Sequence, residues 1–245
     1  EFGIEVGTLT SFYSRKNPEL GNVKILEKKE KFENNNIYIQ SKILIIGEKG
    51  DNAEVEIKDD IKFYDTTCMR KVIFKFCSDS TIRDVVSRYI LNTKLIKRIK
   101  INNHWLTHKG KNKYYQFESE IANISLPTSC ISFLSKKTIQ PQNFEEKFKK
   151  TLYFRDETVD SSPVWIFHSR FLVKQPEIII FKGCTKKYNK SFPLFLNTLL
   201  LKTKFYKICL DIREKYSQKI PFQANGGIKV EKETTFIIED EWKII

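Results

Sequence analysis

Short segments of β-branched and aromatic residues dominate the first half of the chain. Glycine, asparagine and paired acidic residues separate these segments, as turns separate the strands of an antiparallel sheet. In Glu48-Lys49-Gly50-Asp51-Asn52, glycine and asparagine favour the positive φ of a hairpin, so a strand ending near Ile46 should pair with one beginning at Ala53. The predicted strands are Val23–Leu26, Ile37–Ile46, Ala53–Ile57, Ile61–Tyr64 and Lys71–Cys77.

Apolar residues at spacings of three and four predict helices elsewhere in the chain. Ile82, Val85, Val86 and Tyr89 follow the capping residues of Ser78-Asp79-Ser80, which indicates a short helix over Ser80–Ile90. A long amphipathic helix is predicted over Phe192–Ser217, and a third, short one over Phe144–Leu152. Further strands are predicted at Tyr114–Phe117, Ala122–Leu126, Cys130–Leu134, Val164–Phe167, Arg170–Val173, Glu177–Phe181 and Thr234–Ile238.

The order of these elements predicts an α+β fold, with mostly antiparallel sheets and one short and one long amphipathic helix. A polar segment at Lys136–Asn143 suggests a boundary between two lobes. We therefore expect a β-rich lobe with one helix over residues 1–135 and an α+β lobe with the long helix over residues 144–245.

Composition bounds the class of protein. Apolar residues make up 40% of the chain, and no apolar run approaches the roughly 20 residues that a transmembrane helix requires. Five cysteines are dispersed without Cys-x-x-Cys spacing, as in reduced proteins of the cell interior. We expect an intracellular protein, with the nucleus as one candidate compartment.

Charge points to an anionic partner. The chain has 43 Lys and Arg against 30 Asp and Glu, and Val85–Phe117 contains cations and aromatics but no acid. A second acid-free window spans Ile178–Leu210. We predict a non-enzymatic subunit that binds DNA or RNA, or serves as a scaffold, in a nucleoprotein assembly, with other protein subunits as possible partners. The predicted contact residues are Arg88, Lys94, Lys97, Arg98, Lys100, Trp105, Lys109, Lys111, Lys113, Tyr114, Lys186 and Lys187. A lysine-rich genome composition, or windows on opposite faces, would explain the same pattern without any ligand.

Glu54-Val55-Glu56-Ile57-Lys58 places two carboxylates and an ammonium on one face of a strand. It resembles the opening strand of triphosphate-tunnel phosphohydrolases, which implies a metal held by Glu54 and Glu56. That resemblance also implies phosphate-binding cations, for which Arg70, Lys75, Arg98 and Lys100 are candidates, and a distal acidic strand with Glu239 and Glu241. The Glu56-x-Lys58 pair also resembles a strand of metal-dependent nucleases. A solvated strand face shows the same alternation of charges, so we predict no metal site.

Lys71–Ile90 resembles the opening strand and helix of ubiquitin-like and Ras-association modules, which implies a protein-interaction module as an alternative.

The spacing of His104 and His108 suits zinc only on a helix, which the flanking Asn and Gly residues disfavour. His168 lies between strand-like segments and is expected to be satisfied in the core or at a strand end. No serine or cysteine nucleophile motif and no phosphate-binding glycine loop is present, and no cofactor is expected.

Overall fold

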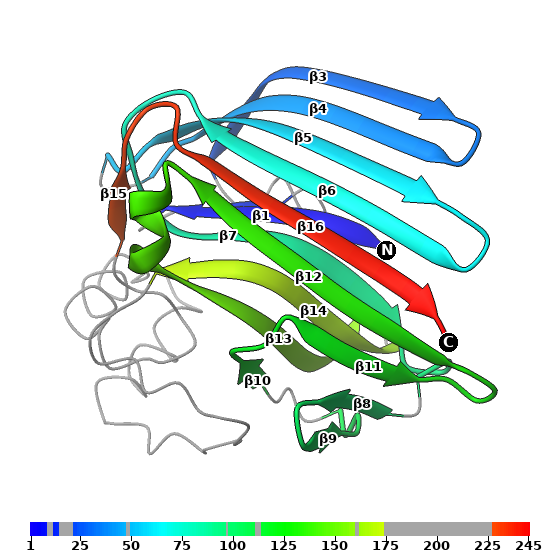
Figure 1. Cartoon of the computed structure of the whole chain (residues 1–245). Coiled ribbons are helices and arrows are strands. Elements are labelled where there is room, and N and C mark those ends of the chain that lie inside the picture. The colour runs from blue at the N-terminus through cyan, green and yellow to red at the C-terminus, as the bar shows by residue number, and fades with distance from the viewer. Residues whose placement is uncertain are drawn as a thin grey trace, which may run out of the picture.

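Two antiparallel β-sheets pack face to face in the computed structural model, and β-strand accounts for 74% of the described residues (Figure 1). The structure describes residues 1–8, 12–14, 22–47, 50–96, 98–110, 114–159, 162–173 and 227–245. The seven strands of sheet A are β1 (Phe2–Thr8), β2 (Phe12–Ser14), β7 (Ser80–Asn92), β10 (Tyr114–Phe117), β13 (Phe148–Val159), β14 (Ser162–Val173) and β15 (Ile228–Val230).

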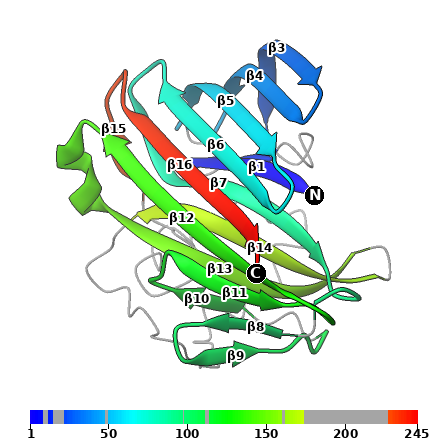
Figure 2. The ribbon, with the colours of Figure 1, turned by 45° about the vertical axis from the view of Figure 1, so that its right-hand side comes forward.

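Sheet B has nine strands in the order β3-β4-β5-β6-β16-β12-β11-β8-β9, so β3 and β9 lie at its two ends (Figure 2). The strands of sheet B are β3 (Val23–Glu33), β4 (Asn36–Ile45), β5 (Ala53–Phe63), β6 (Thr67–Phe76), β8 (Arg98–Ile101), β9 (His104–Leu106), β11 (Ile121–Ser125), β12 (Cys130–Gln140) and β16 (Thr235–Ile244). A six-residue 3-10 helix, η2 (Gln142–Lys147), connects β12 of sheet B to β13 of sheet A. Among the described residues, no helix has the length and apolarity that a membrane span demands.

The five strands predicted over Val23–Cys77 correspond to four strands, β3 to β6, because Ala53–Ile57 and Ile61–Tyr64 are both parts of β5. Strands β1 and β2 were not predicted. The predicted hairpin is confirmed because Ile45 pairs with Ala53 in the antiparallel β4–β5 ladder. Every ladder is antiparallel among the described residues, as expected.

The predicted α+β class is wrong, because the segments predicted as helices that the structure describes are largely strands. Ser80–Ile90 lies within β7, and Phe144–Leu152 divides between η2 and β13. The long helix predicted over Phe192–Ser217 lies outside the described residues. The division of the chain into two lobes remains a prediction.

A register irregularity explains why β7 has the spacing of a helix. The β1–β7 ladder shifts between Gly7 and Thr8, so Ile82 and Val85 share the inner face although they are three residues apart. Val86, on the other face, is buried as well. A strand buried on both faces and interrupted by an irregularity loses the two-residue alternation that identifies strands.

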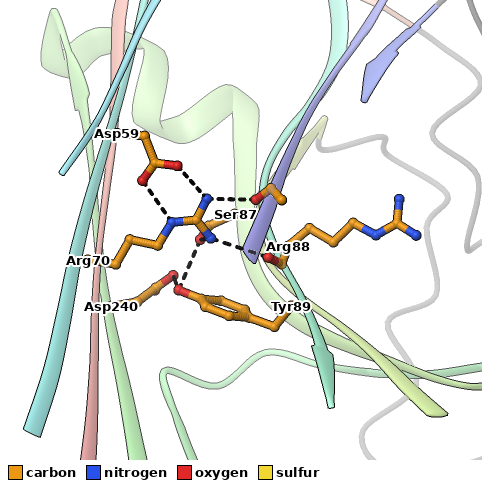
Figure 3. Close-up of polar contacts among 7 residues, drawn as sticks. Asp59, Arg70, Ser87, Arg88, Tyr89 and Asp240 are labelled. Carbon is orange, nitrogen blue, oxygen red and sulfur yellow. Dashed lines mark hydrogen bonds and ion pairs between the residues drawn. The ribbon is translucent and has the colours of Figure 1, made fainter. Parts of the chain in front are cut away.

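A polar network lies between the sheets, amid the buried apolar residues of the core (Figure 3). Arg70 of β6 makes a bidentate contact with Asp59 of β5, through Nε and Nη2 at 2.8 Å each. Its remaining N–H groups donate to Ser87 Oγ and to the carbonyls of Arg88 and Gly3, so all five donors are used. Burial disfavours the charged guanidinium, but the charge and hydrogen bonds of Asp59, together with Tyr89 and Asp240, outweigh burial and raise the pKa of Arg70. The side chain therefore joins sheet B to β1 and β7 of sheet A.

The network continues along the inner faces of both sheets. Tyr89 of β7 donates a 2.5 Å hydrogen bond to Asp240 Oδ2 of β16, and Ser169 of β14 donates to Asp240 Oδ1 at 3.0 Å. Ser135 of β12 lies 2.6 Å from Ser169. Burial, followed by the negative charge of Asp240, raises the pKa of Tyr89 well above its usual value, so the phenol stays protonated as a donor.

Lys137 of β12 is a lysine that lies buried among these core residues. It is 3% exposed, and its Nζ has no hydrogen-bond partner among the described residues. Burial lowers the pKa of the ammonium to about 8. A charge held in the interior at neutral pH costs free energy because it loses its hydration, and the negative charges of Asp240 and Glu120 offset only part of that cost.

Lys137→Met is therefore expected to stabilise the protein at pH 7 by about 2 kcal/mol. Because the pKa of Lys137 is lower in the folded state, the free-energy cost of burying its ammonium is fully present below about pH 8. This cost disappears as the pH rises towards the unfolded-state pKa of 10.5. Urea unfolding at pH 7 and pH 10 measures the difference, which should shrink at the higher pH. The neighbouring, exposed Lys136→Met is the matched control and should be nearly neutral. A destabilised Lys137→Met variant at pH 7 would show that the ammonium is stabilised in place.

Candidate functional site

Polar and charged side chains gather on the face of sheet A that points away from sheet B. We call this set the outer-face cluster. Its members are Glu5 of β1, Asp84 and Arg88 of β7, His168 and Arg170 of β14, and Tyr153 of β13.

The sheet register brings these side chains together. Arg88 pairs with His168, and His168 pairs with Tyr153, so the three form a row across β7, β14 and β13 (Figure 1). The next row contains Glu5 and Arg170, which flank Val86 on the two neighbouring strands. Successive residues of a strand alternate between faces, so this arrangement sets the cluster opposite the inner network. Figure 3 shows the Arg88 side chain extending away from Arg70, although its carbonyl accepts a hydrogen bond from Arg70.

Glu5 and His168 form the centre of the cluster. Arg88 Nη1 donates to Glu5 Oε1 at 2.5 Å, and His168 Nε2 lies 3.9 Å from the same oxygen. His168 is 8% exposed, and among the described residues neither of its ring nitrogens has a hydrogen-bond partner. Buried polar groups are ordinarily hydrogen-bonded, so two unsatisfied ring nitrogens on one imidazole require an explanation.

The electrostatic environment holds the imidazole neutral. Burial, followed by the charges of Arg170, Arg88 and Arg155, lowers the pKa of His168 well below its usual value. Burial also raises the pKa of Glu5, and Asp84 adds to this, while the ion pair with Arg88 favours the carboxylate. The neutral imidazole of His168 therefore lies beside the acidic side chain of Glu5 and among several arginines. In this environment the imidazole accepts a proton readily only if a negative charge lies close to it.

Arg170 is held on several sides. Its Nη2 donates to Gln116 Oε1 at 2.5 Å, its Nη1 lies 3.9 Å from Asp84 Oδ2, and its guanidinium sits 4.6 Å from the centre of the Tyr153 ring. Tyr153 also faces the imidazole of His168, with ring centres 5.0 Å apart. Fixed donors and an aromatic face in one place suit a small ligand that carries oxygen atoms.

Gly7 allows Asp84 to occupy its position. A Cβ on Gly7 would overlap Asp84 Oδ1 and would lie 2.9 Å from Arg83 Nε, so a larger residue would displace this carboxylate. The missing side chain in β1 therefore helps to position the acidic end of the cluster.

The basic, aromatic stretch that predicted a nucleic-acid interface is divided between the two sheets. Arg88 belongs to the outer-face cluster, whereas Arg98, Lys100 and Trp105 lie on the β8–β9 hairpin of sheet B. There Arg98 stacks on the indole of Trp105 at 4.0 Å, and Lys100 lies 5.5 Å from the same ring.

The other predicted contacts that the structure describes lie in a loop, a turn and a strand of sheet A. Lys94 lies in the turn after β7, and the backbone N–H of Lys109 donates to Asp156. Tyr114 is in β10, which pairs with β13 of sheet A. The remaining predicted contacts, Lys97, Lys111, Lys113, Lys186 and Lys187, lie outside the described residues.

The acidic strand behaves as a solvated sheet face. Glu54 forms an ion pair with Lys42 at 2.7 Å, and Glu56 accepts from Gln40 at 2.9 Å and lies 3.7 Å from Lys58. Within the described part of the chain, no group of three or more His, Cys, Asp or Glu side chains could hold a metal ion. Arg70, one of the four candidate phosphate-binding cations, is instead buried against Asp59.

No family model matches the chain, and no curated protein matches it. A solved Escherichia coli protein, described as a candidate aldose 1-epimerase, is 6% identical, with 94% of this chain and 70% of that chain covered and a TM-score of 0.45. A galactose mutarotase related enzyme from Lactobacillus acidophilus is 5% identical, with 98% and 78% covered and a TM-score of 0.44. A galactose mutarotase-like protein from Clostridium acetobutylicum is 7% identical, with 100% and 79% covered and a TM-score of 0.42.

The prediction of a nuclear, nucleic-acid-binding or scaffold subunit is wrong. The described part of the basic stretch is divided between two sheets: Arg88 is ion-paired with Glu5 on sheet A, whereas Arg98, Lys100 and Trp105 lie on the β8–β9 hairpin of sheet B. The ubiquitin-like alternative is unsupported, because its expected helix is strand β7. The phosphohydrolase alternative is unsupported, because its cation Arg70 lies in the core.

Glu5 and Arg170 were not recognised as site residues from the sequence, and His168 was expected to be satisfied. One signal was present. In Trp165-Ile166-Phe167-His168-Ser169-Arg170-Phe171, three consecutive polar residues interrupt an otherwise apolar strand. Such residues are costly to bury, so their presence in a buried strand indicates a polar network or a site.

Proposed function

We propose that the outer-face cluster is a general-base site that binds a small hydroxylated molecule of the aldose class and interconverts its anomers. The observation that carries the proposal is the buried His168 imidazole, whose ring nitrogens have no hydrogen-bond partner among the described residues and which lies 3.9 Å from the Glu5 carboxylate. A ligand hydroxyl would supply the missing hydrogen bond.

Each chemical step has a residue in position. His168 takes the proton of the anomeric hydroxyl, the bond between the anomeric carbon and the ring oxygen breaks, and its electron pair remains on that oxygen. The ring then closes on the other face of the carbonyl, and the proton returns from His168. General-base catalysis of this kind typically accelerates a reaction by about 100 to 10,000-fold.

The neighbours of His168 suit the charges that develop. The Glu5 carboxylate stabilises the imidazolium formed when His168 accepts a proton, because opposite charges 3.9 Å apart attract. The guanidinium of Arg170 is placed to stabilise the negative ring oxygen, and its contacts with Gln116 and Asp84 hold it in position. The low pKa of His168 keeps the base in its active, neutral form at neutral pH.

Anomer exchange measured by NMR tests the proposal directly. We expect the full chain to accelerate exchange between the α and β forms of at least one aldose in a panel of neutral and anionic pentoses and hexoses. Saturation transfer between the two anomeric protons gives the rate, and buffer with an equal mass of albumin gives the background. Background rates across the whole panel would refute the proposal.

A further inference from the structure

Strand β3 is an open edge of sheet B. It pairs with β4 on one side, and among the described residues no strand pairs with its other side (Figure 2). Its 11 residues are exposed from Lys24 to Glu33, on both faces of the strand. An edge of this length presents a row of unpaired backbone N–H and C=O groups to any second strand.

Large apolar side chains lie along this edge. Phe32 is 67% exposed, Ile25 is 49% exposed and Leu26 is 47% exposed. An irregularity between Ile25 and Glu27 interrupts the ladder to β4, and the segment Glu27–Glu33 beyond it is regular. That regular segment is where a second strand can form a continuous ladder.

We propose that β3 pairs antiparallel with β3 of a second copy of this chain, with Lys29 on the two-fold axis. In this register Glu27 lies opposite Lys31 of the other copy, and Lys28 lies opposite Glu30. Because the axis repeats each pair, the interface contains four pairs of opposite charge and one like-charged pair, Lys29 opposite Lys29 on the axis, and Leu26 lies opposite Phe32 at each end. Opposite charges and apolar residues directly across a ladder stabilise strand pairing.

Charge selects this register over its neighbours. In a two-fold symmetric ladder the axis passes through a residue, so the neighbouring registers place it at Glu30 or at Lys28. An axis at Glu30 places Glu27 opposite Glu33, Lys29 opposite Lys31 and Glu30 opposite Glu30, which are all like-charged pairs. An axis at Lys28 leaves only two pairs of opposite charge, Glu27 with Lys29 of the other copy. Like charges directly opposite each other destabilise a ladder, so the alternation in Glu27–Lys31 specifies a self-complementary edge.

Existing contacts within β3 fit the paired state. Lys28 Nζ lies 2.9 Å from Glu30 Oε1 on the same face of the strand. When two copies pair, the two Lys28–Glu30 couples lie side by side and form a ring of four alternating charges. The symmetry is isologous, so the assembly closes as a dimer and does not extend into a fibre.

Exchanging the charges of Glu27 and Lys31 tests the proposed dimer. Sedimentation velocity of the full chain should show a concentration-dependent species at twice the monomer mass of 29.0 kDa. Glu27→Lys alone and Lys31→Glu alone each place like charges opposite each other twice, so each should weaken dimerisation on the order of tenfold or more. An equimolar mixture of the two variants restores both opposite-charge pairs and should dimerise again.

Glu146→Lys, an equal charge change on the exposed surface of η2, is the matched control and should leave dimerisation unchanged. Thermal unfolding of each variant establishes that it is folded. A wild-type chain that stays monomeric at every concentration tested would overturn the proposal. It would also be overturned if Glu27→Lys dimerised as the wild type does, or if the mixture of variants failed to recover. The interface is independent of the outer-face cluster, so these outcomes leave the proposed activity untouched.

Discussion

Arg70→Ala is expected to lower the free energy of unfolding by about 3 to 5 kcal/mol, because it removes one partner of a buried ion pair. Both side chains of the Arg70–Asp59 pair are fully buried. Without the guanidinium, the Asp59 carboxylate loses the charge that neutralises it, and Ser87 Oγ and the carbonyls of Gly3 and Arg88 lose their donor. Urea unfolding followed by circular dichroism measures the loss.

The surface pair Lys71–Glu239 provides the matched control for Arg70. It has an N–O distance of 2.6 Å but is about half exposed, so Lys71→Ala should cost less than about 1 kcal/mol. Arg70→Lys keeps the charge but cannot reproduce five directed hydrogen bonds, and we expect an intermediate loss. If Arg70→Ala cost no more than Lys71→Ala, the network would contribute little to joining the two sheets.

His168→Asn is expected to reduce the rate of anomer exchange by about 100-fold, since it removes the proposed base while keeping a polar side chain of smaller size. Thermal unfolding of the variant establishes whether the loss is chemical or structural. His104→Asn is the matched control, because His104 lies on β9 of the other sheet and should not affect the rate. Equal losses in both variants, or none in His168→Asn, would contradict the assignment of His168.

The pH dependence of anomer exchange provides a second test of His168 as the base. The neutral imidazole is the active form, and its pKa lies well below 6.5, so the rate should stay constant around neutral pH and fall only in acid. Arg155→Gln removes one of the positive charges that lower this pKa, so the acid limb should move to higher pH. An acid limb that did not move would show that the titrating group is not His168.

Local patterns are sufficient for strands that have one buried and one solvated face. β5 alternates buried and partly exposed residues, and its hairpin with β4 contains a glycine at positive φ, Gly50. Both signals arise from neighbours in the chain, so the hairpin was predicted correctly and this segment was predicted as strand, although β5 was divided in two at Lys58-Asp59-Asp60. β7 has no such alternation, because the outward-facing Val86 is buried as well and a register irregularity lies between Ile82 and Asp84, and its three-residue spacing was mistaken for that of a helix.

The sequence by itself determined that this chain forms antiparallel strands with tight turns, and that it carries an excess of positive charge. Only the tertiary structure decided where that charge acts and which polar residues meet. Arg70 contacts Gly3 across 67 positions and Tyr89 contacts Asp240 across 151, while Glu5 meets Arg88 across 83. Strand order and register set these pairs, and neither is encoded in the short-range alternation that predicts a strand. The same basic residue is therefore a solvated cation in one register and part of a buried site in another.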